Sequence, residues 1–432
     1  MRKVGMPQET VSPAQEERIA GLAPKRKMLI VERKLAGNRG HHHTQVPALS
    51  ALLPGHSVHL LAGASYDGFL GEAAGRFGED ATRLARFHAR ARHGSTGQRV
   101  VAWAKLAAAK APFGRPAAFM GDTLYETSRK LGLGRDDLII IPTAELDTLE
   151  AALDFAGRMG SGVPLVSLRF LGGDFGEPDE EIRRQRLKAA CEARADRVVL
   201  YSETEELAAY LRTEFGWDIR GGFYLPCSIA PAPSIFSEKA GDAYRIGIFG
   251  PPRREKGSGR VAGIVEATER VARAEGSPRI EFVIQGADAD FGDAGVYRGL
   301  VRFEAAGGGV AVEKHGDRIS PEAFVALFRS VDAVLLPYDI SVYGLQGSGV
   351  VQDAVAGRKL IIHSAGMAMA NLLDHGNARS AVTDEDFARE IVKAAHAAPQ
   401  ETAAAMENAL AYLQERLREH PLLAAGPSTS GG

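Results

Sequence analysis

Short apolar runs alternate along the chain with longer amphipathic stretches. In the N-terminal half, runs at 28–32, 57–62, 138–141, 165–168 and 197–201 predict strands, and stretches at 146–158 and 204–215 predict helices. In the C-terminal half, strands are predicted at 245–249, 280–284, 310–312, 333–336 and 359–362, and helices at 260–274, 321–330, from 350 and at 400–420. This alternation predicts parallel sheets with helices on both faces.

The proline-rich segment 226–233 interrupts the pattern, which then restarts, so the chain is predicted to hold two doubly wound α/β domains. We expect a flexible N-terminus, a Rossmann-like domain, a linker, a second Rossmann-like domain, a C-terminal helix and a disordered tail, at 1–25, 26–226, 227–243, 244–398, 399–421 and 422–432. Ligands of such sheets bind beyond the carboxyl ends of the strands, so facing domains predict a shared cleft.

Composition narrows the class of protein. Hydrophobic residues make up 45% of the 432 residues and charged residues 25%, which is typical of a folded protein, and the net charge of −2 argues against a nucleic-acid partner. The two cysteines, Cys191 and Cys227, have no CxxC spacing, which argues against a disulfide framework or zinc site. Residues 1–27 lack the apolar core of a signal peptide, and no apolar run reaches the ~18 residues of a membrane span. A cytoplasmic location is therefore predicted.

Two glycine-containing clusters in the second half carry candidate chemistry. Gly250 to Gly257 (GPPRREKG) follows a predicted strand and precedes a helix, so Arg253 and Lys256 can reach a diphosphate at a helix N-terminus. A solvated basic turn is the alternative. In the second cluster, Gly347-Ser348-Gly349 opens a predicted helix that carries Asp353 one turn on, where a carboxylate can bind a ribose diol. The alternative for Asp353 is an acid that complements the helix dipole.

With these clusters in place, residues 245–364 resemble the donor half of a retaining, family-4-like glycosyltransferase of the GT-B fold (glycosyl transferases group 1). The matching features are the strand, glycine, basic pair and KG at 245–257, and the segment LPY…Y…GSG within 332–362. Weaker matches in the first half are GNRGHHH (37–43), YSETEEL (201–207) and LPCSI (225–229). The resemblance implies two facing Rossmann-like domains with the acceptor on the first and the nucleotide sugar on the second.

The resemblance also implies roles for individual residues. Arg253 and Lys256 would bind the diphosphate and stabilise the departing nucleotide, and His42 or His43 would act in catalysis. The other donor-binding residues would be Gly250, Gly286, Tyr338, Tyr343, Gly347, Ser348, Gly349 and Asp353. Candidate acceptor-binding residues are Gly40, His41, Thr143, Glu145 and Arg169. No metal and no cofactor are implied, since basic side chains and helix dipoles take the leaving-group charge.

The chain departs from the family pattern at three positions. Of the usual pair of glutamates, the second position is Asp353 and the first is Leu345, which has no carboxylate. Pro251 stands where arginine is usual, and Arg358 where glycine is common. The three histidines also allow a metal tripod or a polar surface loop, and Glu203 and Thr204 are interpreted as helix-capping residues.

A basic segment in the first half is the last feature. Residues 81–115 contain eight Lys or Arg and no acid, interleaved with apolar residues that include Phe87 and Trp103. Such a segment suits an anionic membrane surface, and the alternative is a basic helical pair that covers the sheet. The prediction is a glycosyltransferase that moves a sugar from a nucleotide diphosphate to a glycan or lipid-linked acceptor in polysaccharide or glycoconjugate synthesis, peripheral to the cytoplasmic membrane. A nucleotide-sugar epimerase of the same fold and a non-catalytic sugar-nucleotide-binding subunit are the alternatives.

Overall fold

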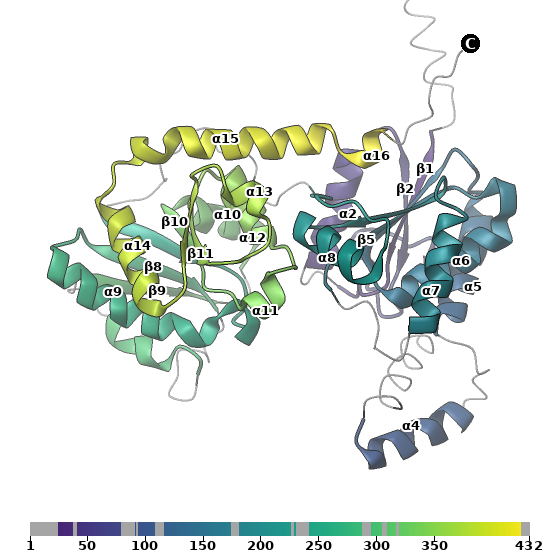
Figure 1. Ribbon diagram of the computed structural model, residues 1–432, viewed down its shortest axis with the longest axis horizontal. Coiled ribbons are helices and arrows are strands. Elements are labelled where there is room, and N and C mark those ends of the chain that lie inside the picture. The colour runs from purple at the N-terminus through teal and green to yellow at the C-terminus, as the bar shows by residue number, and fades with distance from the viewer. Residues whose placement is uncertain are drawn as a thin grey trace, which may run out of the picture.

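Two parallel sheets form the framework of the computed structural model, which describes residues 25–37, 41–78, 91, 94–108, 116–173, 181–225, 229, 242–286, 295–304, 309–316 and 319–424 (Figure 1). The first sheet contains β1 (Lys27–Glu32), β2 (Ser57–Ala62), β3 (Gly75–Arg76), β4 (Leu138–Ala144), β5 (Leu165–Phe170) and β6 (Val198–Ser202). The second contains β7 (Tyr244–Ile248), β8 (Ile280–Gln285), β9 (Val310–His315), β10 (Ala333–Leu336), β11 (Leu360–Ser364) and β12 (Ala378–Ala381).

The two sheets share one topology. The first has the strand order β3-β2-β1-β4-β5-β6, and the second, read as β9-β8-β7-β10-β11-β12, has the same order. All the pairings between these strands are parallel. The order reverses between β1 and β4 and again between β7 and β10, and such switch points are where doubly wound sheets bind ligands. The predicted pair of Rossmann-like sheets is confirmed.

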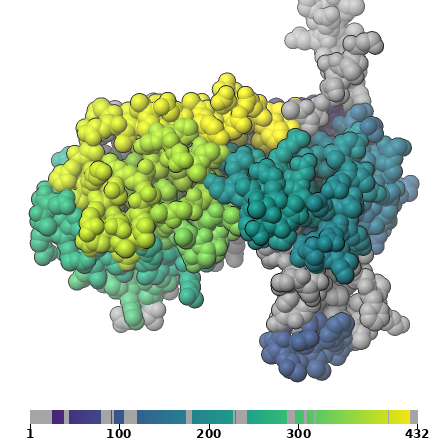
Figure 2. Space-filling model, viewed as in Figure 1, coloured from purple at the N-terminus to yellow at the C-terminus, as the bar shows by residue number. Residues whose placement is uncertain are grey.

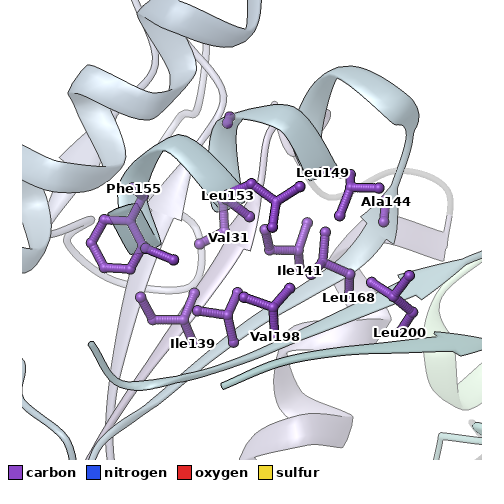
Figure 3. Close-up of a cluster of buried hydrophobic side chains, with 14 of the residues drawn as sticks. Val31, Ile139, Ile141, Ala144, Leu149, Leu153, Phe155, Leu168, Val198 and Leu200 are labelled. Carbon is purple, nitrogen blue, oxygen red and sulfur yellow. The ribbon is translucent and has the colours of Figure 1, made fainter. Parts of the chain in front are cut away.

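Helices cover both faces of the first sheet. One face packs against α5 (Pro116–Leu131), α6 (Leu146–Met159), α7 (Glu181–Glu192) and α8 (Glu205–Phe215). Figure 3 shows Leu149, Leu153 and Phe155 of α6 lying over Ile139, Ile141 and Leu168 of the strands. The other face packs against α2 (His41–Leu52) and Leu422. A sheet buried on both faces explains the unbroken apolar runs of its strands.

The second sheet is covered in the same way. One face packs against α9 (Val261–Glu275) and α14 (Asp384–His396). The other packs against α10 (Pro321–Arg329), α12 (Gly349–Ala356), α13 (Ala370–Leu373) and α15 (Pro399–Arg418). The short helix α11 (Ile340–Tyr343) lies between β10 and α12. These layers place the N-terminus of α12 beyond the carboxyl end of β10, where the glycine loop was predicted.

The long helix α15 crosses from the second domain back toward the first (Figure 1). Its Ala409 and Leu413 pack in the second domain, whereas Leu422 of α16 (Pro421–Ala424) is 4% exposed in the core of the first domain. The disordered tail was expected to begin at residue 422, so the structure differs here: the apolar pair Leu422 and Leu423 forms a helical turn because the first domain offers an apolar face. Residues 425–432 lie outside the described part.

Candidate functional site

A cavity of about 430 Å³ lies where the carboxyl ends of the two sheets face each other. The first domain contributes the residues Thr44, Gln45, Arg169, Leu171, Glu203 and Leu225. The second domain contributes Phe249, Gly250, Pro251, Arg253, Lys256, Gln285, Phe324, Tyr343, Gln346, Gly347, Ser348, Gly349, Val350, Gln352 and Asp353. Both predicted glycine clusters therefore meet at a single cavity.

The first glycine loop connects β7 to α9, and its backbone geometry depends on glycine at both ends. Gly250 has φ 91° and Gly257 has φ 70°, a region that side chains disfavour. A Cβ at Gly257 would lie 1.9 Å from the Pro337 carbonyl oxygen. The Gly250 N–H donates to Gln285 Oε1 at 3.0 Å, which ties the loop to the end of β8. The loop is thus held close to the strand ends with Arg253 and Lys256 on the cavity wall.

Two cations of this loop face the cavity with little neutralising charge. Burial, and secondly the charge of Arg253, lowers the pKa of Lys256 to about 8. No ion pair joins Lys256 to a carboxylate in the part of the chain that the structure describes, and its Nζ lies 5.7 Å from the centre of the Tyr338 ring. Arg253 is half-exposed, and its ion pair with Glu255 is long at 3.9 Å. The two cations Arg253 and Lys256 together attract an anion. A negative ligand would offset both the cost of burying Lys256 and the repulsion between the two charges.

The second glycine loop begins α12. Ser348 is the N-cap residue, and its backbone N–H donates to the Met369 sulfur at 3.2 Å. Gly349 has open space around its Cα, so a ligand can approach the backbone there. The aromatic rings of Tyr338 and Tyr343 lie 4.3 Å apart beside this loop, and burial raises the pKa of Tyr343 to about 12. The helix N-terminus and neutral tyrosines are suited to an anionic ligand.

Asp353 lies on the cavity wall and is 7% exposed. Its Oδ1 accepts a hydrogen bond of 3.1 Å from the backbone N–H of Ile229. The carboxylate therefore has a structural contact to the chain that joins the domains, and its contact with a ribose stays a prediction.

The other predicted donor residues lie around the same strand ends. Gly286 directly follows Gln285 and donates its N–H to the His315 carbonyl at 2.9 Å. Tyr338 is buried beneath Lys256 and lines a neighbouring cavity. Neither residue is part of the wall of the cavity between the domains, so each would act through its neighbours.

The predicted acceptor residues are spread over a wider area. Arg169 lines the cavity, whereas Thr143 and Glu145 do not. The Thr143 hydroxyl donates to Glu32 Oε2 at 2.6 Å, and Glu145 pairs with Arg33 at 2.6 Å and with Lys34. These contacts hold Thr143, at the end of β4, and Glu145, the N-cap residue of α6, against the end of β1 and the residues that follow it.

The three histidines begin α2, so their backbone forms the first turn of a helix and not a surface loop. Gly40 and the side chains of His41, His42 and His43 lie outside the described part. Thr44 and Gln45, on the same turn, line the cavity. The N-terminus of α2 therefore reaches the cavity from the first domain.

Glu203 has a different role from the one predicted. Thr204 is the N-cap residue of α8 and accepts from the Leu207 N–H at 3.1 Å, as expected. Glu203, instead of capping, pairs with Arg169 at 2.7 Å and lines the cavity. Its position directly after β6, at the carboxyl end of a parallel strand, is the signal that identifies it. Gln45 and Gln285 were also missed.

The described residues contain neither a candidate metal centre of three or more ligands nor a candidate membrane span. Among them, no cluster of three or more His, Cys, Asp or Glu side chains has the arrangement of a metal site. The sequence Asp288-Ala289-Asp290, whose two carboxylates could form a metal-ligand pair, lies outside the described part. Every helix of the described ranges is too short or too polar to span a bilayer.

The two sheets, the cleft between them and the returning C-terminal helix define a GT-B fold. Solved structures that share it include OtsA trehalose-6-phosphate synthase (TM-score 0.60, 12% identity, over 93% of this chain and 99% of that chain). A trehalose-6-phosphate structure from E. coli bound with UDP-2-fluoro glucose is similar at TM-score 0.60 and 13% identity, over 93% and 99% of the two chains.

A third similar structure is a UDP-forming α,α-trehalose-phosphate synthase from Burkholderia xenovorans in complex with glucose-6-phosphate. It has TM-score 0.57 and 13% identity, and the match covers 93% of this chain and 100% of that one. No protein-family model and no curated protein matches the sequence. The likeness therefore extends over nearly the whole chain and concerns the fold.

Proposed function

We propose that the protein is a glycosyltransferase that moves a sugar from a nucleotide diphosphate to an acceptor hydroxyl. The observation that carries this proposal is the convergence of two glycine loops, with Arg253, Lys256 and the N-terminus of α12, on one cavity between two Rossmann-like domains. The two glycine loops would hold a diphosphate between them. The charges of Arg253 and Lys256 and the N-terminus of α12 would stabilise it as a leaving group. The similar structures bound with UDP-2-fluoro glucose and glucose-6-phosphate support a UDP-sugar as the first donor to test.

The reaction would exchange two bonds at the anomeric carbon. The bond to the diphosphate oxygen breaks as the acceptor oxygen bonds to the same carbon, and His42 or His43 takes the acceptor proton. Arg253 and Lys256 stabilise the charge that develops on the diphosphate. Retention of the anomeric configuration is supported by the family resemblance and by a similar trehalose-6-phosphate synthase described for glycosyl transfer with retention. The product's anomeric configuration, measured by nuclear magnetic resonance, tests it.

The acceptor is proposed from the charge of the first-domain wall. Among the described first-domain residues that line the cavity, the cation is Arg169, and Glu203 neutralises it. That balance favours a neutral hydroxyl of a glycan over a sugar phosphate. Assays that offer glucose-6-phosphate beside neutral oligosaccharides and lipid-linked sugars separate these acceptors.

Membrane attachment is a proposal that rests on α4 (Thr96–Ala108). This helix lies well apart from both sheets, at the bottom of Figures 1 and 2. Val100, Val101 and Trp103 are 65%, 54% and 53% exposed, within the basic segment 81–115. Exposed apolar and basic residues together suit the headgroup region of an anionic leaflet. A cytoplasmic location fits the buried thiol of Cys191, whose pKa is raised by burial to about 12.

The test of function measures binding and transfer on the same protein. The parent should bind UDP by calorimetry and transfer or hydrolyse a UDP-sugar, and activity should persist in excess EDTA. Arg253→Ala and Lys256→Ala should each weaken UDP binding by roughly 10- to 100-fold, because each removes a charge-assisted hydrogen bond. Arg254→Ala is the matched control, since Arg254 belongs to the same loop but lines the neighbouring cavity.

The outcomes separate the alternatives. UDP affinity unchanged in both variants would contradict the donor site, and loss of activity in EDTA restored by manganese would contradict the metal-free mechanism. Interconversion of two UDP-sugars without an acceptor would indicate an epimerase, and UDP-sugar binding without any turnover would indicate a binding subunit.

A further inference from the structure

Leu345 occupies the position of the first acid in the family pattern, and the structure shows where its side chain goes. Leu345 packs against the core of the first domain, and a Cβ added at Gly173 would lie 3.0 Å from its Cδ1. The Leu345 carbonyl accepts a hydrogen bond of 2.6 Å from Thr204 Oγ1. Leu345 therefore joins the two domains and contributes no polar group to the cavity.

The residue before Thr204 brings a carboxylate to the same place from the other domain. Glu203 is 7% exposed and lines the cavity. Its Oε1 accepts from Arg169 Nη2 at 2.7 Å, and its backbone N–H donates to the Phe170 carbonyl at 3.0 Å. Its Oε2 has no hydrogen-bond partner among the residues that the structure describes. A buried carboxylate with one oxygen fixed by arginine and one unpaired is a ready acceptor for ligand hydroxyls.

The unpaired oxygen lies against the second glycine loop. A Cβ at Gly347 would be 2.5 Å from Glu203 Cδ and 2.6 Å from Oε2. Gly347 directly precedes the Ser348 N-cap of α12, where the diphosphate is proposed to bind. In a nucleotide sugar the sugar is bonded to that diphosphate. The sugar would therefore lie within reach of Glu203.

A second buried acceptor lies on the same wall of the first domain. Gln45 lines the cavity and is 6% exposed, and its side-chain oxygen is buried with no hydrogen-bond partner among the described residues. Two acceptors without donors call for a ligand rich in hydroxyl groups. A sugar offers several hydroxyl donors to these two groups, whereas an ionised phosphate offers none.

We propose that Glu203 binds the hydroxyls of the donor sugar and determines which sugar is accepted, supplying from the first domain the carboxylate that Leu345 does not. Arg169 is its positioning residue: buried at 3% exposure, it also donates to the Phe223 carbonyl at 3.0 Å and so fixes the direction of the carboxylate. This inference rests on the proposed function, because it needs a nucleotide sugar in the cavity. It assigns the sugar-recognition step to a residue that closure of the two domains brings to the loop.

The experiment compares nucleotide and nucleotide sugar on the same variants. Calorimetry measures the dissociation constants of UDP, UDP-glucose, UDP-galactose and UDP-N-acetylglucosamine for the parent and Glu203→Gln. We expect UDP to bind both proteins within about 3-fold, while the preferred UDP-sugar loses about 10- to 100-fold with the variant, as for a hydrogen bond to a charged group. The differences in dissociation constant among the three UDP-sugars should also be smaller for Glu203→Gln than for the parent.

Two further variants keep the test decisive. Glu205→Gln is the matched control, since Glu205 lies two residues further along the chain and its carboxylate packs against Gly221 and Gly222. Glu203→Asp retains the charge that Arg169 needs and withdraws the carboxylate from Gly347, so it carries the test if the amide variant does not fold. A parent that binds no UDP overturns the proposed function and the inference with it. UDP binding together with an unchanged sugar preference in both Glu203 variants overturns the inference alone.

Discussion

At the scale of single residues, Lys256 is a partly buried cation on the wall of the cavity. Its ammonium group is surrounded by Tyr338, Gly250 and the like charge of Arg253, and these surroundings lower its pKa to about 8. The charged form is therefore retained near neutral pH at a cost. A bound diphosphate would offset that cost and raise the pKa again.

This arrangement predicts a pH dependence of nucleotide binding. As the pH rises from about 7 to about 10, Lys256 loses its proton in the empty cavity, and UDP affinity should fall by roughly 10- to 100-fold because a charge-assisted hydrogen bond is lost. Lys256→Arg keeps its charge throughout that range, since an arginine pKa exceeds ~12. Calorimetry across this pH range should therefore show a UDP affinity that falls with pH for the parent and changes less for Lys256→Arg. A parent affinity that does not change with pH would contradict a contact between Lys256 and the diphosphate.

The residues of the site were predictable from the sequence where the backbone itself makes the site. Gly250 and Gly347 to Gly349 were found because glycine between a strand and a helix indicates a close backbone approach. Glu203 was missed because an acid beside a helix start is equally typical of capping, and only the register of β6 shows that it points into the cleft. The contact of Asp353 with Ile229 joins residues 124 apart in the chain, which no local pattern reveals.

At the scale of elements, buried parallel strands were the most predictable. The runs at 57–62 and 333–336 match β2 and β10 at both ends, and β10 is an unbroken apolar run that is buried along its whole length. Helix α7 was missed because it contains four Arg or Lys residues beside few apolar ones, so its apolar face is narrow. Edge strand β12 was missed because it has four residues and three of them are not buried.

The α16 turn is predicted to stabilise the first domain from the far end of the chain. Leu422 is 4% exposed within the core that includes Met28 and Leu49. Leu422→Ala should lower the free energy of unfolding of that domain by about 2–5 kcal/mol, as expected for a leucine deleted from a core. Leu423→Ala is the matched control, because Leu423 is 43% exposed on the same turn. Urea denaturation followed by fluorescence measures both, and equal midpoints for the two variants would contradict docking of α16 on the first domain.

Helix α4 is predicted to bind anionic vesicles. Each Lys or Arg near an anionic leaflet contributes about 1 kcal/mol, and the exposed Val101 and Trp103 can insert at the headgroups. The parent should co-sediment with phosphatidylserine-rich vesicles at low salt. This binding should weaken sharply as the salt concentration rises, and binding to neutral vesicles should be far weaker. Val101→Asp should weaken binding, whereas Val382→Asp should not, since Val382 is 69% exposed on the second domain. A parent that stays in the supernatant at low salt would favour an acceptor free in solution.

At the scale of the whole molecule, the two domains are joined by contacts that surround the cavity. Besides Thr204 and Leu345, the Tyr224 hydroxyl donates to Asn371 Oδ1 at 2.7 Å. The Glu206 carboxylate accepts from the backbone N–H groups of Met369 and Ala370, at 3.1 and 2.9 Å, at the start of α13. Two of the side chains involved, Thr204 and Glu206, lie at the start of α8, so one helix end of the first domain binds two segments of the second. In this structure the two domains therefore contact each other directly around the cavity.

Loss of the Glu206 contact is predicted to open the molecule. Two hydrogen bonds to a charged acceptor contribute about 1.5–3 kcal/mol each, so Glu206→Ala should shift the free protein toward a form with separated domains. Small-angle X-ray scattering should then give a larger radius of gyration than for the parent. The matched control is Glu214→Ala, because Glu214 lies exposed on the same helix. A nucleotide sugar that contacts both walls of the cavity would favour the form with the domains in contact, so a saturating concentration should return the variant to the parent's radius of gyration. Equal radii for the variant and the parent without ligand would show that the remaining contacts, Thr204 with Leu345 and Tyr224 with Asn371, are sufficient to keep the domains closed.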